Sequence, residues 1–173
     1  MKRLLEFAGA LLVAVTLHLI GTRLVSEWPL ILDLMLIVVL FAALDGNTLS
    51  GLAAGLAAGW ATDAVAGTPF GLFGAIDTMI GYGAALAAQR VVIERAAGAA
   101  LFFAAAALVQ QGLFLGLSLV LLAAPETSAY RWLAVKVAAT GVLGAILFHL
   151  RQRLANRLDL WRHTRRTKIR LDR

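Results

Sequence analysis

Residues 51–67, with the sequence GLAAGLAAGWATDAVAG, carry glycine at every fourth position until Asp63 takes the place of the next glycine. Residues four apart lie one above another on a helix, so Gly51, Gly55 and Gly59 form a groove without side chains. In lipid, small residues of this kind let two helix backbones approach closely. The stretch therefore predicts a tightly packed helix pair, and it raises the question of why a carboxylate ends the row.

The composition places this packing in a membrane. Of the 173 residues, 61% are hydrophobic and only 15% are charged, and the mean hydropathy is +0.83. A soluble domain of this length needs more polar surface. A spanning helix needs about 20 apolar residues, so six spans would use most of the chain. Cysteine is absent, which excludes disulfides and thiolate chemistry.

Six apolar segments predict an all-α integral membrane protein, built as a compact bundle of six transmembrane helices. The approximate segments are 4–25, 30–44, 48–66, 70–89, 97–123 and 129–150. The charged-then-apolar start is interpreted as a retained first span, not a cleaved signal peptide. Turn chemistry separates the spans. Pro29 suits a first helical turn, Asp45-Gly46-Asn47 suits a tight turn, and Thr68 is a candidate N-cap before Pro69.

The basic residues predict the orientation of the bundle. With a cytoplasmic N-terminus, thirteen of the sixteen Lys and Arg residues fall on the cytoplasmic side, nine of them after residue 150. The other three are Arg23, Arg131 and Lys136. Cytoplasmic segments carry the excess of Lys and Arg, so both termini are predicted to be cytoplasmic. The net charge of +6 thus comes mostly from the tail and does not indicate a nucleic-acid surface.

The predicted domains are a transmembrane domain at 1–150 and a basic amphipathic cytoplasmic tail at 151–173. The tail is expected to continue the sixth span as a helix, with Leu154, Leu158 and Trp161 on one face. Its charge either anchors the topology or binds anionic lipid and presents a contact for cytoplasmic partners. The residues expected at the membrane surface are Arg153, Arg157, Trp161, Arg162, Arg165 and Arg166.

Three carboxylates, Asp33, Asp63 and Asp77, fall in the outward half of the predicted spans. A charged side chain there costs about 2.5–3.5 kcal/mol even on lenient insertion scales, so it should face protein or a water-filled cavity. Asp63 also lies in the last turn of its helix, where the dipole disfavours an anion. A structural ion-pair network, a substrate pocket and a partner-binding site are all open interpretations. The expected network adds Arg23, Arg131 and Lys136 to the three carboxylates.

The group that compensates Asp63 is expected to be one of these basic side chains, or a backbone or hydroxyl donor such as Thr68. Asp77 cannot serve, because two close carboxylates repel and one would stay protonated. An asparagine at position 63 should be tolerated if Asp63 is merely capped by donors. It should be damaging if a cation depends on the charge.

Residues 46–89, GNTLSGLAAGLAAGWATDAVAGTPFGLFGAIDTMIGYGAALAAQ, resemble the central pattern of the rod shape-determining protein MreD family. That pattern has glycines at four-residue spacing, an Asp, a Gly, a small turn, another Gly and then Gly-Tyr. Residues 28–40, WPLILDLMLIVVL, also resemble the second span of that family. The motif covers about a third of the chain, and the rest agrees in architecture. The matching positions are Gly51, Gly55, Asp63, Gly67, Gly71, Gly81 and Tyr82.

The resemblance implies a non-enzymatic scaffold of the bacterial cell-elongation machinery, which supports rod shape and peptidoglycan synthesis from the inner membrane. The implied partners are a membrane-anchored MreC-like protein, MreB filaments and the RodA–penicillin-binding-protein synthase, with no cofactor. The family is also similar in fold to S components of energy-coupling-factor transporters, so a vitamin-binding transporter subunit is the alternative. The residues expected for helix packing or a partner interface are Gly51, Gly55, Gly59, Gly67, Gly71, Gly74, Gly81 and Tyr82.

Enzymatic activity has little support in the sequence. Ser118 and His149 are the residue types of an intramembrane serine protease, but a Gly-x-Ser-Gly pattern is missing. The two residues also fall at different depths of the predicted spans. His18 is isolated, so no metal-ligand spacing exists. We therefore expect neither a catalytic residue nor a metal ligand.

Overall fold

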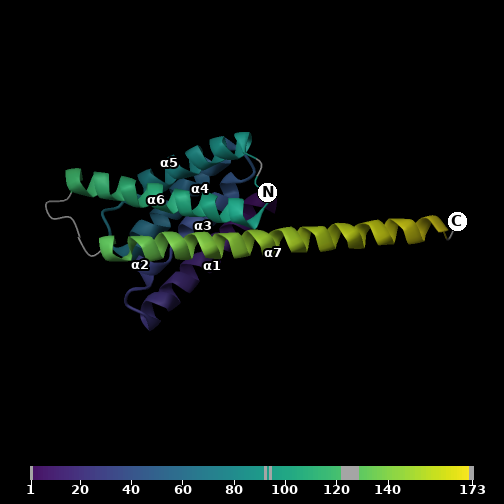
Figure 1. The fold of residues 1–173 in the computed structure, drawn as a ribbon, viewed down its shortest axis with the longest axis horizontal. Coiled ribbons are helices and arrows are strands. Elements are labelled where there is room, and N and C mark those ends of the chain that lie inside the picture. Colours follow the sequence, from purple (N-terminus) through teal and green to yellow (C-terminus); the bar gives the residue numbers. More distant parts are fainter. Residues whose placement is uncertain (1, 92, 94, 122–128, 172–173) are drawn as a thin grey trace.

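The computed structural model describes the backbone of residues 2–91, 93, 95–121 and 129–171. Side chains are described in these ranges except at 2, 4, 121, 129–130 and 155–171. Every regular element there is an α-helix, which confirms the predicted all-α class. In chain order the helices are α1 (Lys2–Leu24), α2 (Trp28–Ile31), α3 (Leu34–Ala43), α4 (Thr48–Ala66), α5 (Leu72–Arg90), α6 (Ala96–Leu121) and α7 (Ala129–Leu171) (Figure 1).

Three described helices are long and apolar enough to cross a membrane, which indicates a membrane protein. The apolar windows are Leu5–Leu24 in α1, Ala96–Val120 in α6 and Arg131–Leu154 in α7. Helices α4 and α5 have 19 residues each. At 1.5 Å per residue they are about 28 Å long, close to the thickness of a bilayer core. Both are rich in glycine and alanine, so they are less apolar than leucine-rich helices of the same length.

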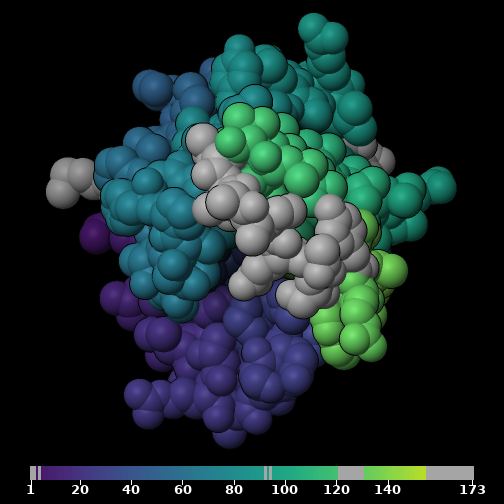
Figure 2. Space-filling model, turned by 90° about the vertical axis from the view of Figure 1, so that its left-hand side faces the viewer, coloured from purple at the N-terminus to yellow at the C-terminus, as the bar shows by residue number. Residues whose placement is uncertain are grey.

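The helices pack as two antiparallel pairs around a central helix. Helix α4 pairs with α5, and α6 pairs with α7, while α3 contacts α1, α4 and α5. The central position of α3 explains why Leu36, Val39 and Leu40 are fully buried. Figure 2 shows the end of the bundle away from the C-terminus, with the purple and blue N-terminal helices gathered at its lower side.

The main core lies between α3, α5 and α6. Leu36, Leu40, Ile76 and Phe103 form its centre, and all four are fully buried. The Phe103 ring centroid lies 5.2 Å from that of Phe41 on α3. Apolar side chains of three helices thus fill the middle of the bundle and hold α3 in place.

The second predicted span, 30–44, is not one continuous helix. Helix α2 ends at Ile31 and α3 begins at Leu34, because Leu32 and Asp33 adopt extended backbone conformations with φ of −144° and −115°. The Asp33 side chain accepts a hydrogen bond from the Leu36 amide at 3.0 Å, so it caps a new helix. Pro29 does lie in the first turn of α2, as predicted. The expectation of an uninterrupted helix was wrong because Asp33 starts a helix instead of continuing one.

The last helix is the longest in the structure. Helix α7 has 43 residues and runs without a break past residue 150, projecting beyond the bundle (Figure 1). Arg153 is exposed on it. The predicted surface residues Arg157, Trp161, Arg162, Arg165 and Arg166 lie outside the described side chains, so their membrane contact stays a prediction.

Candidate functional site

The glycine row of α4 lies directly against the backbone of α5. A Cβ added at Gly51 would collide with the carbonyl oxygen of Gly81. At Gly55 it would meet the carbonyl of Asp77, and at Gly59 that of Phe73. Each step of four along α4 is a step of four back along α5, as in an antiparallel pair. The predicted groove is therefore filled by a helix backbone, and only glycine fits there.

Asp63, the next residue in the row, accepts four hydrogen bonds, two from the turn before α5 and two from the first turn of α5. Its Oδ1 accepts from the Thr68 hydroxyl at 2.8 Å and the Phe73 amide at 2.9 Å. Its Oδ2 accepts from the amides of Gly71 at 2.8 Å and Gly74 at 3.1 Å. The residue is 2% exposed. The compensating group is thus a set of backbone and hydroxyl donors, one of the alternatives expected from the sequence.

This arrangement explains why a carboxylate ends the glycine row. The first amides of a helix lack intrahelical acceptors and carry the positive end of its dipole. Three glycines bring α4 close enough to α5 for a short side chain to reach those amides. The α5 terminus thereby offsets the unfavourable position of Asp63 in the last turn of its own helix. Asp63 locks the α4–α5 pair by capping the neighbouring helix.

The sequence suggested that asparagine would be tolerated at a capped Asp63, but the four donors revise this expectation, and Asp63→Asn should be damaging although no described cation pairs with Asp63. Each carboxylate oxygen accepts two hydrogen bonds, and an asparagine NH2 group in place of either oxygen would face two donors. Hydrogen bonds to charged groups contribute about 1.5–3 kcal/mol each, so we expect a loss of about 2–3 kcal/mol. The thermal midpoint of the purified protein in detergent measures this. Thr68→Val, which removes one donor, should cost less, and an unchanged midpoint in Asp63→Asn would contradict the capping role.

A buried ion pair joins the broken second segment to α7. The ammonium of Lys136 lies 3.2 Å from Asp33 Oδ2, with the two side chains 10% and 6% exposed. The other carboxylate oxygen caps α3. Both oxygens of Asp33 are thus used inside the protein. Lys136 was expected in the network of buried carboxylates, and it pairs with Asp33 because the break before α3 turns that carboxylate toward α7.

The third carboxylate, Asp77, is fully buried on α5 and bonds to a residue that sequence analysis missed. Gln110 of α6 donates from Nε2 to Asp77 Oδ1 at 2.8 Å. Among the described residues, Asp77 Oδ2, Gln110 Oε1 and the Thr140 hydroxyl have no hydrogen-bond partner. Asp77 is also close enough to Asp33 for the two to interact electrostatically. A glutamine in the middle of an apolar span was the signal that could have revealed this second polar centre.

Two members of the expected network lie elsewhere. Arg23 and Arg131 are exposed, and neither forms an ion pair with a described carboxylate. Both sit near the ends of their helices, where their long side chains can reach the membrane surface. The buried network therefore contains one ion pair, Asp33–Lys136, and two carboxylates held by neutral donors.

Several residues expected to pack helices serve the turn between α4 and α5 instead. Gly67 has φ +66° and ends α4, while Gly71 has φ +100° and precedes α5. A Cβ on either would contact nothing within 4 Å, so glycine is needed for its left-handed backbone. Thr68 does not cap α5, because its hydroxyl donates to Asp63. Tyr82 is 43% exposed on the outer face of α5.

The remaining helical glycines divide into packed and open positions. A Cβ at Gly74 would meet the Trp60 ring, and one at Gly81 the Gly51 carbonyl. Gly141 and Gly144 of α7 pack against α6 in the same way, on Ala100 and Phe103. In contrast, a Cβ at Gly112 or Gly116 of α6 would contact nothing within 4 Å. These two glycines form an open pair at four-residue spacing.

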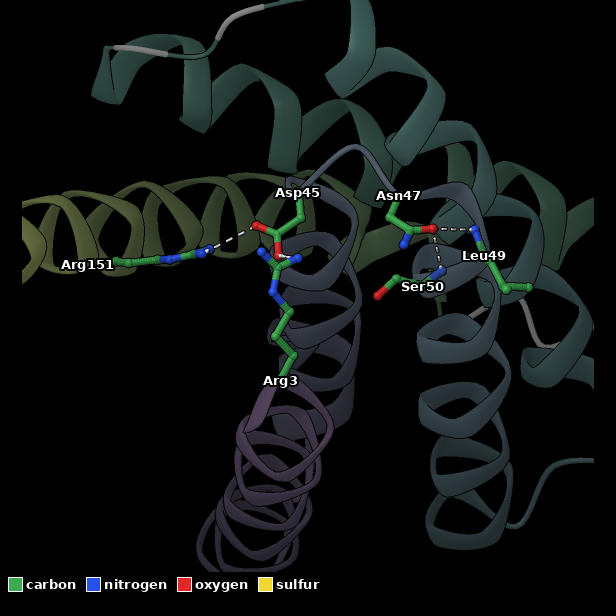
Figure 3. A network of polar contacts seen from close by, with 6 residues as sticks. All are labelled: Arg3, Asp45, Asn47, Leu49, Ser50 and Arg151. Carbon is green, nitrogen blue, oxygen red and sulfur yellow. Dashed lines mark hydrogen bonds and ion pairs between the residues drawn. The ribbon is translucent and has the colours of Figure 1, made fainter. Parts of the chain in front are cut away.

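A polar cluster also ties the helices together at the end where α1 begins. Asp45 pairs with Arg3 of α1 at 3.1 Å and with Arg151 of α7 at 3.5 Å (Figure 3). Next to it, Asn47 caps α4 by accepting from the Leu49 and Ser50 amides. The predicted turn at residues 45–47 is therefore confirmed, and its aspartate joins three parts of the chain.

The side chains that could bind a metal ion do not cluster in the described part of the chain. Among them, no group of three or more His, Asp or Glu side chains could hold a metal ion. Ser118 donates its hydroxyl to the Leu115 carbonyl of its own helix. What the site can do is hold helices in register with buried polar contacts. No protein-family model, curated protein or solved structure was found to match the chain.

Proposed function

We propose that the protein is a six-span membrane scaffold with both termini in the cytoplasm, and that it holds another membrane protein through lateral helix contacts. The basic asymmetry of the sequence supports the orientation. A reporter fused at residue 68 should be found outside, and one fused at 173 inside. The MreD-like pattern of residues 46–89 makes the cell-elongation complex of a bacterial inner membrane the proposed setting.

The observation that carries this proposal is that the buried carboxylates are occupied within the chain. A pocket for a cationic vitamin would need carboxylate oxygens free to receive the ligand. Both oxygens of Asp63 and both of Asp33 already have internal partners. Of these three buried carboxylates, only Asp77 retains an oxygen without a hydrogen-bond partner among the described residues. This arrangement favours a structural network over the binding site of a transporter S component.

The open glycine pair on α6 is the proposed contact for the partner. The other row of glycines at four-residue spacing lies on α4, and the backbone of α5 packs against it. Gly112 and Gly116 present the same pattern at the surface, beside the exposed Val109 and Val120. Small residues at this spacing let a second transmembrane helix pack closely. An MreC-like protein with one membrane anchor is the proposed owner of that helix, and MreB filaments and the RodA-type synthase would join through it.

Gly116→Leu should separate partner binding from folding. The leucine points into open space, so the stability measured from the thermal midpoint should change by less than about 0.5 kcal/mol. Recovery of the partner by affinity purification in mild detergent should fall at least tenfold. Gly83→Leu is the matched control, because Gly83 is an equally open glycine on α5, and it should keep full recovery. Equal recovery in both variants would contradict the proposed interface.

Purification of the tagged wild-type chain tests the function itself. We expect a membrane-anchored protein of the elongation machinery to co-purify. A chain that purifies alone and is thermally stabilised by thiamine, riboflavin or biotin would contradict the scaffold and support the transporter subunit.

A further inference from the structure

A groove of about 490 Å³ opens between α1 and α3. Its apolar walls include Phe7, Leu17 and Phe41, with Leu147 of α7 closing one side. One end of the groove carries a charged rim formed by Arg3, Glu6, Asp45 and Arg151. The groove is separate from the buried carboxylate network and from the open glycines of α6. The groove is thus apolar along its length and polar at one end.

The length of the groove matches one leaflet of a membrane. From Phe7 to Leu17 is ten helical residues, or about 15 Å. This is half of a hydrocarbon core about 30 Å thick. The charged rim lies where α1 begins and where α7 leaves the bundle (Figure 1). In a membrane-spanning orientation, the rim would stand at the head-group level of the leaflet that faces the chain termini.

The mixed lining of the groove favours a hydrocarbon chain over a helix. Large side chains such as Phe7 and Phe41 line the walls together with the smaller Ala10 and Ala14, whereas close helix contacts in lipid favour an unbroken row of small residues. The lining and the charged rim therefore fit an apolar chain that carries a polar group at one end.

The rim carries both positive and negative side chains. They complement the negative phosphate and the positive ammonium group of a zwitterionic head group. Arg3 and Arg151 share the single carboxylate of Asp45, with their side chains 82% and 55% exposed (Figure 3). One carboxylate cannot satisfy the five N–H donors of each guanidinium, and planar guanidinium groups bind phosphate well. Glu6 pairs with no described basic residue. These four side chains sum to zero charge, so they give no excess attraction for an anionic head group.

We infer that the groove binds phosphatidylethanolamine from the leaflet that faces the chain termini. One acyl chain lies along α1 and α3, the phosphate bridges Arg3 and Arg151, and the ammonium group faces Glu6. A bound lipid in this position would fill the space between α1 and the rest of the bundle. It would also join α1, α3 and α7 at the rim, where Asp45 already links them.

Native mass spectrometry of the purified full-length chain tests the head group. Phosphatidylethanolamine and phosphatidylglycerol with identical acyl chains are added in separate titrations. We expect at least threefold higher occupancy by phosphatidylethanolamine, and a loss of at least fivefold in the Arg3→Gln, Arg151→Gln double variant. Glu6→Gln should shift the preference toward phosphatidylglycerol. Equal or higher occupancy by phosphatidylglycerol in the wild type would overturn the assignment.

A second pair of variants tests whether an acyl chain lies in the groove. Ala10 is exposed and lines the groove, whereas Ala8 is exposed on α1 outside it. Ala10→Phe should fill the groove and lower lipid occupancy at least fivefold. Ala8→Phe should leave lipid occupancy unchanged. The thermal midpoint of each variant shows that it folds. Unchanged lipid occupancy in Ala10→Phe would overturn the proposal. So would an Ala10→Phe variant that still binds lipid but no longer co-purifies with a partner protein, because the groove would then hold that protein.

Discussion

Gly55→Leu should yield no stably folded protein. The first side-chain carbon at this position would overlap the carbonyl of Asp77, and the backbone of Thr78 is also within contact distance. To admit a leucine, α4 and α5 must separate along their length. That movement would also pull Asp63 away from the amides of α5. We expect a loss of more than about 4 kcal/mol, a range that single substitutions seldom reach.

Size-exclusion chromatography in mild detergent measures the folded fraction of this variant. Gly83→Leu makes the same change on an open face of α5, and it should elute as the wild type does. This comparison separates the lost contact from any general intolerance of leucine in a glycine-rich helix. Normal elution and an unchanged thermal midpoint in Gly55→Leu would show that the two helices do not meet at the glycine row.

Lys136→Met should be the next most damaging change. It leaves Asp33 ionised and buried without its counterion, although the α3 cap remains. Breaking a buried ion pair by removing one partner costs about 3–5 kcal/mol. The thermal midpoint in detergent again measures the loss. Arg131→Met is the matched control, because Arg131 is exposed and forms no described ion pair, and surface changes of this kind stay within about 0.5 kcal/mol.

A double-mutant cycle then isolates the pair. Asp33→Asn keeps an oxygen to cap the Leu36 amide and removes the charge. Combined with Lys136→Met, it removes both charges of the pair, so the double variant should lose less stability than the sum of the two single losses. Residues in contact usually couple by about 0.5–3 kcal/mol. Additive losses would show that Asp33 and Lys136 do not interact in the folded protein.

The α4–α5 pair was the part of the fold that local sequence could predict. Its glycine spacing, its tight turns and the small residues around Asp63 all lie within about forty residues of one another in the sequence. A groove without side chains has one physical use in lipid, close contact with another backbone. The donors to Asp63 were also among the alternatives, since a short connection brings the start of α5 near.

The remaining polar contacts depend on how distant helices meet, which local patterns do not encode. Asp33 fits either a helix interior or a helix start, and the sequence alone does not choose between them. The break before α3 decides that Lys136 pairs with Asp33. Gln110 was overlooked because an amide carries no charge, although it holds Asp77. The pairing of acids with bases was therefore the least predictable feature of the site.

In-cell photo-cross-linking from α6 tests the scaffold proposal most directly. A photo-cross-linking amino acid at Val109, one turn from Gly112 on the same exposed face, should give one discrete adduct with another membrane protein. Adding Gly116→Leu should abolish that adduct, and the same cross-linker at the exposed Leu12 of α1 should not form it. If Val109 gives no adduct, or one that persists in Gly116→Leu, the open glycine pair does not hold a partner helix.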